Sequence, residues 1–443
     1  MLHLCNAMAL FFAVVVARAT CLWFNSSTSR NGGCPGQSGD LVQTLENLEM
    51  KKTLVALAAL AATASFAQSS VSIYGNLDQA LWRSTDSSKQ ASDISSNAGT
   101  TSVLGFKGTE DMGGGLSANF NLLSELSLKE GQMGSSTSGN AAGSGQKPNI
   151  FTRGATVGVA SKTWGSLDVG RVTDSAWTSQ GSLNNTGMNS FGWNTLTATS
   201  GNPGATGVGI FTGKTTADTT FSGTTAAAGV LGTADTAQTG SSPFNFGGGF
   251  SYTSPNLGGL VGSVQSFGTT NSSPTAKTGN GMAYSLNYTT GALRLVYGNS
   301  YRAGSDGAKA ISFSVYGAEY KMGQYTFVGG ITKNKYVGTM AASQDDVTVT
   351  GLGIGYDLTP QIELKGAYTT LKNDEVDGYK TKITAVTARY KFSARTSVYG
   401  GYGRGSNDGA NNKQTVFYGG PAAGTTAGGV GSTGMLVGIK HAF

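Results

Sequence analysis

The sequence has few of the residues on which metal proteins and disulfide-stabilised domains depend. Its 443 residues include three cysteines and two histidines. The cysteines are Cys5, Cys21 and Cys34, so the chain beyond residue 34 has no cysteine and one histidine, His441. That part must be stabilised by burial and hydrogen bonding without disulfides. A zinc site there would lack its usual ligands, and we expect no metal and no cofactor.

Catalytic motifs are also missing. The sequence contains no G-x-S-x-G and no H-E-x-x-H, the motifs that supply a serine nucleophile or a zinc-bound water. The glycine-rich run at 351–355 is not followed by a helical pattern, which a dinucleotide-binding loop requires. An enzyme is therefore the least favoured function class.

Charge and long apolar runs are scarce as well. Only 12% of residues are charged and the net charge is +6. Beyond residue 67 the basic residues are scattered singly, which argues against a nucleic-acid surface. After Ala67 no apolar run reaches the roughly 18 residues that a membrane-spanning helix needs. What is abundant is glycine, 68 residues, together with serine, threonine and tyrosine, which favours many strands joined by turns. A soluble β protein and a transmembrane β-barrel both fit this composition.

An export signal lies fifty residues into the chain. Lys51 and Lys52 follow Met50, residues 54–64 form a short apolar run, and residues 65–67 (Ser-Phe-Ala) form a small-x-small cleavage site. This is the layout of a bacterial signal peptide, which we assign to 50–67. Residues 1–49 are then best explained as an upstream extension from a start codon assigned too early, with a long natural leader as the alternative. The exported part is 68–443.

Beyond the signal the chain alternates with period two. In 362–371, Leu364 and Tyr368 fall on one face and Glu363 and Lys365 on the other. The same alternation runs through 103–107, 293–297, 348–356 and 386–392, and the polar face often carries full charges.

The connections between these strands alternate in length. Seven tight turns lie at 110–115, 162–165, 254–259, 289–291, 321–323, 358–360 and 393–394. Eight longer loops lie at about 85–100, 129–150, 174–245, 269–280, 303–308, 337–345, 373–378 and 407–430. Short turns at one end and long loops at the other are typical of outer-membrane barrels. The sequence therefore predicts an all-β, transmembrane antiparallel barrel of 16 strands.

Two features near strand ends add to this prediction. Six aromatic residues are candidates for the girdles at the membrane interfaces: Tyr74, Trp82, Tyr252, Tyr356, Tyr390 and Tyr399. The last strand alternates up to Phe443, the final residue, which resembles the recognition strand read by the barrel-assembly machinery.

Seven stretches, in order, resemble the general diffusion porins of β-proteobacteria, the Neisseria–Burkholderia–Comamonas type. They are SSVSIYGNLD (69–78), LGFKGTEDMGGGL (104–116), RGATVG (153–158), GSLDVGR (165–171), YTSPNLGGL (252–260), FSARTSVYGGY (392–402) and VGIKHAF (437–443). The resemblance covers essentially all of 50–443.

The resemblance implies a water-filled channel in the bacterial outer membrane for passive diffusion of ions and small hydrophilic solutes. It also implies a homotrimer and a third external loop folded inward to narrow the pore. The longest segment, 174–245, occupies that position, and we expect 174–198 to form the constriction. The partners expected are therefore solutes, ions, outer-membrane lipid, other copies of the chain and the barrel-assembly machinery, with no nucleic acid.

The candidate pore residues follow from strand parity and from this resemblance. Arg153 and Arg171 resemble arginines of the family by position. Parity places five further basic residues inside the barrel: Lys107, Arg294, Lys365, Arg389 and Lys391. Glu363 and Asp174 are candidates for the opposing negative charge.

Two observations leave the ion preference open. Val103 stands where anion-selective relatives tend to have an arginine, and Lys214 is the only basic residue within 174–245. Parity also puts Arg153 and Arg171 on the same face as apolar neighbours. A bulge, or an outer face of small residues packed on another subunit, would explain this. The alternative function is a surface adhesin or binding protein on a barrel scaffold.

Overall fold

The computed structural model describes ten stretches of the chain. They are residues 70–86, 90–133, 150–193, 195–196, 245–268, 280–303, 309–336, 346–374, 380–408 and 430–443. The expected extension (1–49) and signal peptide (50–67) lie outside these residues, and so does nearly all of 199–245.

Within the described residues, sixteen long strands follow one another along the chain. They are β1 (Ser70–Asp86), β3 (Val103–Gly113), β4 (Leu116–Ser127), β6 (Gly154–Ser161), β7 (Gly165–Thr173), β8 (Asn245–Thr253), β9 (Leu260–Phe267), β10 (Gly281–Thr290), β11 (Leu293–Ala303), β12 (Lys309–Met322), β13 (Tyr325–Tyr336), β14 (Val347–Asp357), β15 (Ile362–Asn373), β16 (Lys380–Lys391), β17 (Thr396–Asp408) and β18 (Ser432–Ala442). Two short strands extend the hairpins of β1 and β4: β2 (Gln90–Ser96) and β5 (Gln132–Met133).

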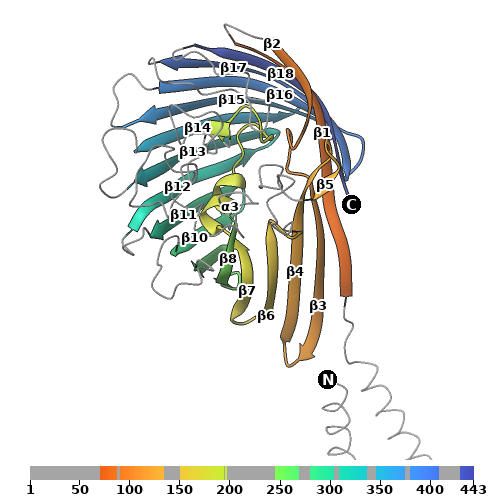
Figure 1. Cartoon of the computed structure of the whole chain (residues 1–443), viewed down its shortest axis with the longest axis vertical. Helices are drawn as coiled ribbons and strands as arrows, with labels where there is room; N and C mark the ends of the chain where they lie inside the picture. Colours follow the sequence, from red (N-terminus) through yellow and green to blue (C-terminus); the bar gives the residue numbers. More distant parts are fainter. Residues whose placement is uncertain are drawn as a thin grey trace, which may run out of the picture. The chain divides into compact units, whose positions relative to one another are not determined.

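The sheet closes on itself, as predicted. Each long strand pairs antiparallel with its neighbours in the chain, and β1 pairs with β18 from Asn76↔Ala442 to Asp86↔Ser432. The other half of β1 pairs with β3, so the first strand joins the last (Figure 1). Closure leaves no open edge, which a sheet in lipid requires because no water is there to pair its backbone groups.

The two faces of the sheet differ as the alternation predicts. On β16, Val386 is 58% exposed whereas Ile383 and Ala385 are at most 2% exposed. The exposed side chains form an apolar band over successive strands, the face that meets lipid in a barrel of this kind. The opposite, inner face carries buried polar groups and most of the charges.

Half of the predicted girdle residues lie on the wrong face. Tyr252, Tyr356 and Tyr390 belong to the outward, apolar face. Tyr74, Trp82 and Tyr399 lie on the inner face instead: Trp82 and Tyr399 are 4% exposed. Partners inside the barrel explain the difference for the two tyrosines, whose hydroxyls donate to Asn121 at 2.5 Å and to Asp78 at 2.7 Å.

The seven tight turns appear where the sequence predicted them, all at the same end of the strands. At the tips of three of them Gly115, Gly291 and Gly323 have φ values of +80°, +53° and +59°, a region that favours glycine. The longer connections lie at the other end, and one of them contains the helix α3 (Ser175–Gly181). Among the described residues, no helix is long and apolar enough to cross a bilayer.

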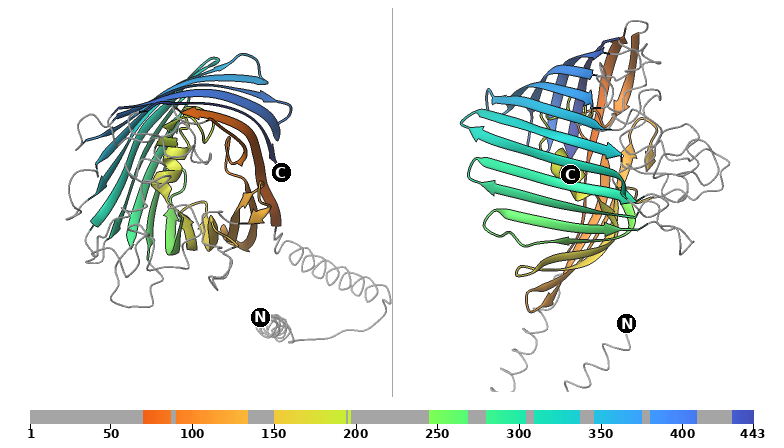
Figure 2. Two further views of the ribbon diagram at one scale, coloured as in Figure 1. Left: turned by 45° about the horizontal axis from the view of Figure 1, so that its top comes forward. Right: turned by 90° about the vertical axis from the view of Figure 1, so that its left-hand side faces the viewer.

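Helix α3 lies on the concave side of the sheet (Figure 2). It contacts β9 to β12, and a Cβ added at Gly298 of β11 would lie 2.6 Å from the Cα of Ala176. The folding of the whole 174–245 segment into the pore stays a prediction, because residues 197–244 are outside the described part of the chain.

Candidate functional site

Residues 174–196 follow β7 and begin with a capped helix. Asp174 is the N-cap: its Oδ1 accepts from the amides of Ala176 at 2.8 Å and Trp177 at 3.3 Å. Its Oδ2 is 3.1 Å from Nη2 of Arg302 on β11, and both side chains are 0% exposed. The expectation that Asp174 offers a free carboxylate to the pore is therefore wrong, because its charge is fully buried and paired.

Two aromatic side chains of this segment fit against glycines of the barrel wall. A Cβ at Gly330 would lie 2.1 Å from the ring of Trp193, and one at Gly403 would lie 2.4 Å from the ring of Phe191. Trp193 also donates from its indole nitrogen to Thr332 at 3.3 Å, and both aromatics are 0% exposed. The two rings fit against the strands only because Gly330 and Gly403 have no side chains.

Basic residues of the C-terminal strands bind the backbone of the same segment. Arg294 donates to the carbonyl of Ser182 at 3.1 Å, and Arg389 donates to the carbonyl of Gly187 at 2.5 Å. A hydrogen bond from a charged donor is stronger than a neutral one. The segment is therefore held to β11 and β16 by charge-assisted contacts as well as by its aromatic rings.

These two arginines belong to a charged surface that we call the C-terminal wall. Its members are Arg294, Glu319, Glu363, Lys365, Arg389 and Lys391. Glu363 is its centre: its carboxylate lies 3.3 Å from Lys365, 3.9 Å from Arg389 and 3.8 Å from Lys391. Arg294 lies opposite Glu319 in the register of β11 and β12. The wall has four cations and two carboxylates.

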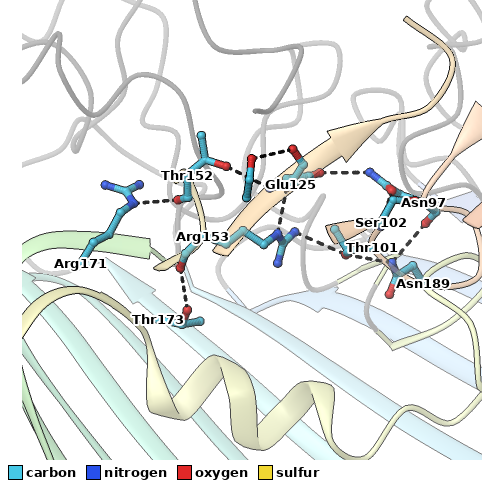
Figure 3. A network of polar contacts seen from close by, with 10 residues as sticks. Asn97, Thr101, Ser102, Glu125, Thr152, Arg153, Arg171, Thr173 and Asn189 are labelled. Atoms are coloured by element: carbon cyan, nitrogen blue, oxygen red, sulfur yellow. Dashed lines mark hydrogen bonds and ion pairs between the residues drawn. The ribbon is translucent and has the colours of Figure 1, made fainter. Parts of the chain in front are cut away.

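A second charged surface, the N-terminal wall, comprises Lys107, Glu125, Arg153, Asp168 and Arg171. Arg153 pairs with Glu125 at 3.0 Å and donates to Thr101 at 3.4 Å (Figure 3). Asn189 of the 174–196 segment donates to the same Thr101 oxygen at 3.4 Å. Arg153 therefore meets the segment through a shared neutral side chain.

Inside the barrel, the N-terminal wall borders a cavity of about 460 Å³. Polar side chains from β1 to β9 line it, among them Tyr74, Lys107, Asn121, Arg153, Asp168 and Arg171. The ammonium of Lys107 lies over the ring of Tyr74, 5.0 Å from its centroid. Lys107, Arg153 and Arg171 thus border the same polar cavity, and an ion that entered it would come close to all three positive charges.

The structure also explains why parity failed for the two arginines. The β7–β8 register shifts between Gly170 and Val172, where Arg171 alone lies opposite two residues of β8, Gly247 and Gly248, and its side chain borders the cavity. Arg171 donates to the carbonyl of Thr152 at 2.7 Å. Arg153 lies just before β6 begins, where the strict alternation no longer applies.

Sequence reasoning missed the parts that hold the segment in place. Trp193, Phe191 and Arg302 carried no recognisable signal, because their partners are single glycines or one acid far away in the chain. The pairing of Arg302 with the N-cap Asp174 could not be predicted from the sequence, because the two residues become neighbours only when β11 and residue 174 come together in the fold.

Comparison with known proteins gives a consistent result. A family model described as Gram-negative porin matches residues 53–410. Outer membrane porin protein 32 of Delftia acidovorans is 30% identical over 407 residues, covering 89% of this chain and 100% of that protein. An outer membrane porin protein of Bordetella pertussis is 34% identical over 144 residues, 29% of this chain and about a third (34%) of the relative's length.

A solved structure has the same fold. The anion-selective porin from Comamonas acidovorans superposes with a TM-score of 0.63 at 21% identity, over 85% of this chain and 100% of that one.

Proposed function

Because this chain belongs to the Gram-negative porin family, we propose that its two charged walls and residues 174–196 form the constriction of its channel. The protein is an outer-membrane porin, a water-filled channel for passive diffusion and not an enzyme. An ion that crosses the channel would pass the charged side chains of both walls at its narrowest point, and their electric field would act on the ion there.

One observation carries the proposal. Residues 182–190 contact the C-terminal wall through Ser182 and Gly187 and approach the N-terminal wall through Asn189. The segment therefore spans the space between both sets of charges. A fixed charge in a narrow and poorly screened passage acts strongly on a permeating ion, whereas a charge at a wide rim does so weakly.

The balance of charge supports a preference for anions. The two walls together carry seven cations and four carboxylates, and Lys107 has no carboxylate within ion-pair distance among the described residues. The structurally similar porin from Comamonas acidovorans is itself described as anion-selective. We expect a moderate preference, because Glu125 and Glu363 offset part of the positive field.

Planar bilayers test both parts of the proposal. The purified channel should conduct, and in a salt gradient its reversal potential should have the sign of anion preference. A protein that inserts without conducting would support the adhesin alternative, and a cation-selective reversal potential would show that the two walls do not set the field.

Export and assembly complete the proposal. We expect cleavage of the 50–67 signal and a mature start at or near Gln68, with 1–49 absent from the exported protein. Mass spectrometry of outer-membrane material checks this, and a mature chain that retained Cys34 would contradict it. The barrel-assembly machinery would recognise the terminal strand. Directly after that strand, Phe443 exchanges two backbone hydrogen bonds with Gly75, at 3.1 and 3.2 Å.

Trimer formation is proposed from the family and from one outward surface. On β6 and β7 the outward face carries small apolar side chains, of which Val157 is 63% and Val169 is 53% exposed. Such a face suits contact with another copy of the chain as well as with lipid. Heat-modifiable migration on gels and cross-linking would establish the oligomeric state.

A further inference from the structure

A short turn on the inner side of the sheet contacts the 174–196 segment. Residues 97–102 connect β2 to β3, and we call them the inner turn. Two of its carbonyl groups accept hydrogen bonds from successive amides of the segment, Asn189 and Ser190, both at 3.1 Å. The side-chain amide of Asn189 donates to a third carbonyl of the turn, that of Asn97, at 3.1 Å (Figure 3). The inner turn therefore holds the segment through three hydrogen bonds.

The inner turn also supports the N-terminal wall. The side-chain amide of Asn97 donates to one carboxylate oxygen of Glu125 at 3.0 Å, and Arg153 donates to the other at 3.0 Å. Arg153 also donates to Thr101 of the turn at 3.4 Å. The inner turn is thus hydrogen-bonded to both the segment and the wall, and its position fixes how far apart they stand.

One buried carboxylate holds the inner turn against the barrel. Asp78 of β1 is 0% exposed, and its Oδ1 accepts from the amide of Gly99 at 3.0 Å and the hydroxyl of Tyr399 at 2.7 Å. The backbone of Asp78 binds the turn as well: its amide donates to the hydroxyl of Ser102 at 2.9 Å, and its carbonyl accepts from the amide of Asn97 at 3.2 Å. Asp78 therefore joins β1, the inner turn and β17 at one point.

The fit of the inner turn against this carboxylate requires a glycine. A Cβ added at Gly99 would lie 2.6 Å from Oδ2 of Asp78 and 2.6 Å from the ring of Tyr399. Both neighbours belong to strands of the barrel, so a larger residue at this position has to push the turn away from the wall.

The segment is strained next to its contacts with the inner turn. Phe191 has a φ of +68°, a left-handed value that bulky residues rarely adopt, and its ring packs against Gly401 and Gly403. A residue keeps such a conformation only where its surroundings enforce it. The hydrogen bonds from Asn189 and Ser190 to the inner turn come directly before Phe191, so we expect this part of the segment to shift when they are lost.

We propose that Asp78 is a positioning residue of the pore. Through the inner turn it sets the distance between residues 189–191 and the N-terminal wall, and with it the largest solute that the channel admits. Asp78 is buried and touches no solute, so its effect acts through the turn alone. The proposal rests on the proposed constriction, in which the 174–196 segment narrows the channel.

The test uses the purified full-length channel in liposomes, with neutral sugars as probes so that size is measured apart from charge. Asp78→Ala removes the carboxylate, whereas Asp78→Asn keeps an oxygen that can accept from both Gly99 and Tyr399. Ser84→Ala is the matched control: Ser84 is a buried residue of the same strand, and its hydroxyl has no hydrogen-bond partner among the described residues. Liposome swelling gives the rates of entry of a monosaccharide, a disaccharide and a trisaccharide.

We expect Asp78→Ala to raise trisaccharide entry relative to monosaccharide entry by about twofold or more, because passage of a solute close to the size of the opening depends steeply on pore diameter. Asp78→Asn and Ser84→Ala should match wild type. Gly99→Ala changes no charge and should widen the channel as Asp78→Ala does, which provides a second test if Asp78→Ala does not fold. Unchanged heat-modifiable migration on gels would show that the variants form folded barrels.

Wild-type sugar selectivity in folded Asp78→Ala or Gly99→Ala would overturn the proposal. Asp174→Ala, which frees the start of the segment, separates this failure from a failure of the proposed constriction. If Asp174→Ala admits larger sugars and Asp78→Ala does not, the segment narrows the channel but the inner turn does not set its width. If neither variant admits larger sugars, the 174–196 segment is not the constriction and both proposals are wrong.

Discussion

The two charged walls use the same residue types for different purposes. On the C-terminal wall, Arg294 and Arg389 donate to backbone carbonyls of the 174–196 segment, and Glu363 lies among three cations. On the N-terminal wall, Arg153 binds Glu125 and Lys107 borders an open cavity. We infer that one wall mainly holds the segment and the other mainly sets the field.

Because of this difference, the structural role of a cation can be separated from its contribution to the electric field in the channel. A cation that holds a carbonyl contributes to structure even when its field is offset by a nearby carboxylate. A cation beside an open hollow contributes to the field whether or not the segment moves. Substitutions on the two walls should therefore change different properties of the channel, the stability of the open pore in one case and its ion preference in the other.

The largest effect should follow loss of the buried pair that fixes the start of the segment. Asp174→Ala deprives the guanidinium of Arg302 of this carboxylate at a position that is 0% exposed. Breaking one partner of a buried ion pair costs about 3–5 kcal/mol, and the lost cap adds about 1 kcal/mol. We expect a lower unfolding temperature in heat-modifiability gels and noisy, enlarged single-channel conductance.

The double variant Asp174→Ala/Arg302→Met is the matched control. Replacing both charges with apolar groups is often nearly neutral, so this variant should recover much of the stability that the single variant loses. If single and double variants were equally unstable, the pair would not be what holds the segment.

The next effect should come from Arg389, the tether on the C-terminal wall. Arg389→Gln removes a charged hydrogen bond to the carbonyl of Gly187, worth about 1.5–3 kcal/mol. We expect more frequent closing events or substates in single-channel records, with little change in reversal potential because Glu363 already offsets the charge. Arg153→Gln is the comparison variant and should show the opposite pattern, a shifted reversal potential in a quiet channel.

The sequence predicted most of the barrel but little of what distinguishes the walls. Alternation such as Leu364 against Glu363 indicates which side chains share a face. The sixteen strands, their turns and the inward direction of Lys365 and Arg389 could therefore be predicted from the sequence. The contacts that hold the 174–196 segment depend on shape, as with Trp193 against Gly330, and a glycine in a strand gives no hint of what fills its place.

Arg171 shows where strand alternation fails to predict the direction of a side chain. The register of β7 and β8 shifts by one residue between Gly170 and Val172, and no local feature of the sequence fixes where the shift occurs. Arg153 precedes its strand, so its direction depends on how the chain enters the sheet. The pairs Arg153–Glu125 and Arg302–Asp174 are likewise products of closure, since their members are far apart in the chain.

A smaller effect should follow Glu363→Gln on the C-terminal wall. The substitution removes the carboxylate shared by Lys365, Arg389 and Lys391 and leaves three cations close together. The reversal potential should move further toward anions, and more so at low salt, where the Debye length is about 10 Å or longer. An unchanged reversal potential in bilayer recordings would mean that this wall is outside the field that ions feel.

The most direct test of the account is a pair of charge reversals read out as reversal potentials in a salt gradient. Arg153→Glu reverses a charge beside the cavity, whereas Lys372→Glu reverses a 65% exposed charge on the outward face. We predict a clear shift toward cations for Arg153→Glu, larger at low salt, and a much smaller shift for Lys372→Glu. Equal and small shifts from both substitutions would contradict it, because Arg153 would then lie outside the constriction.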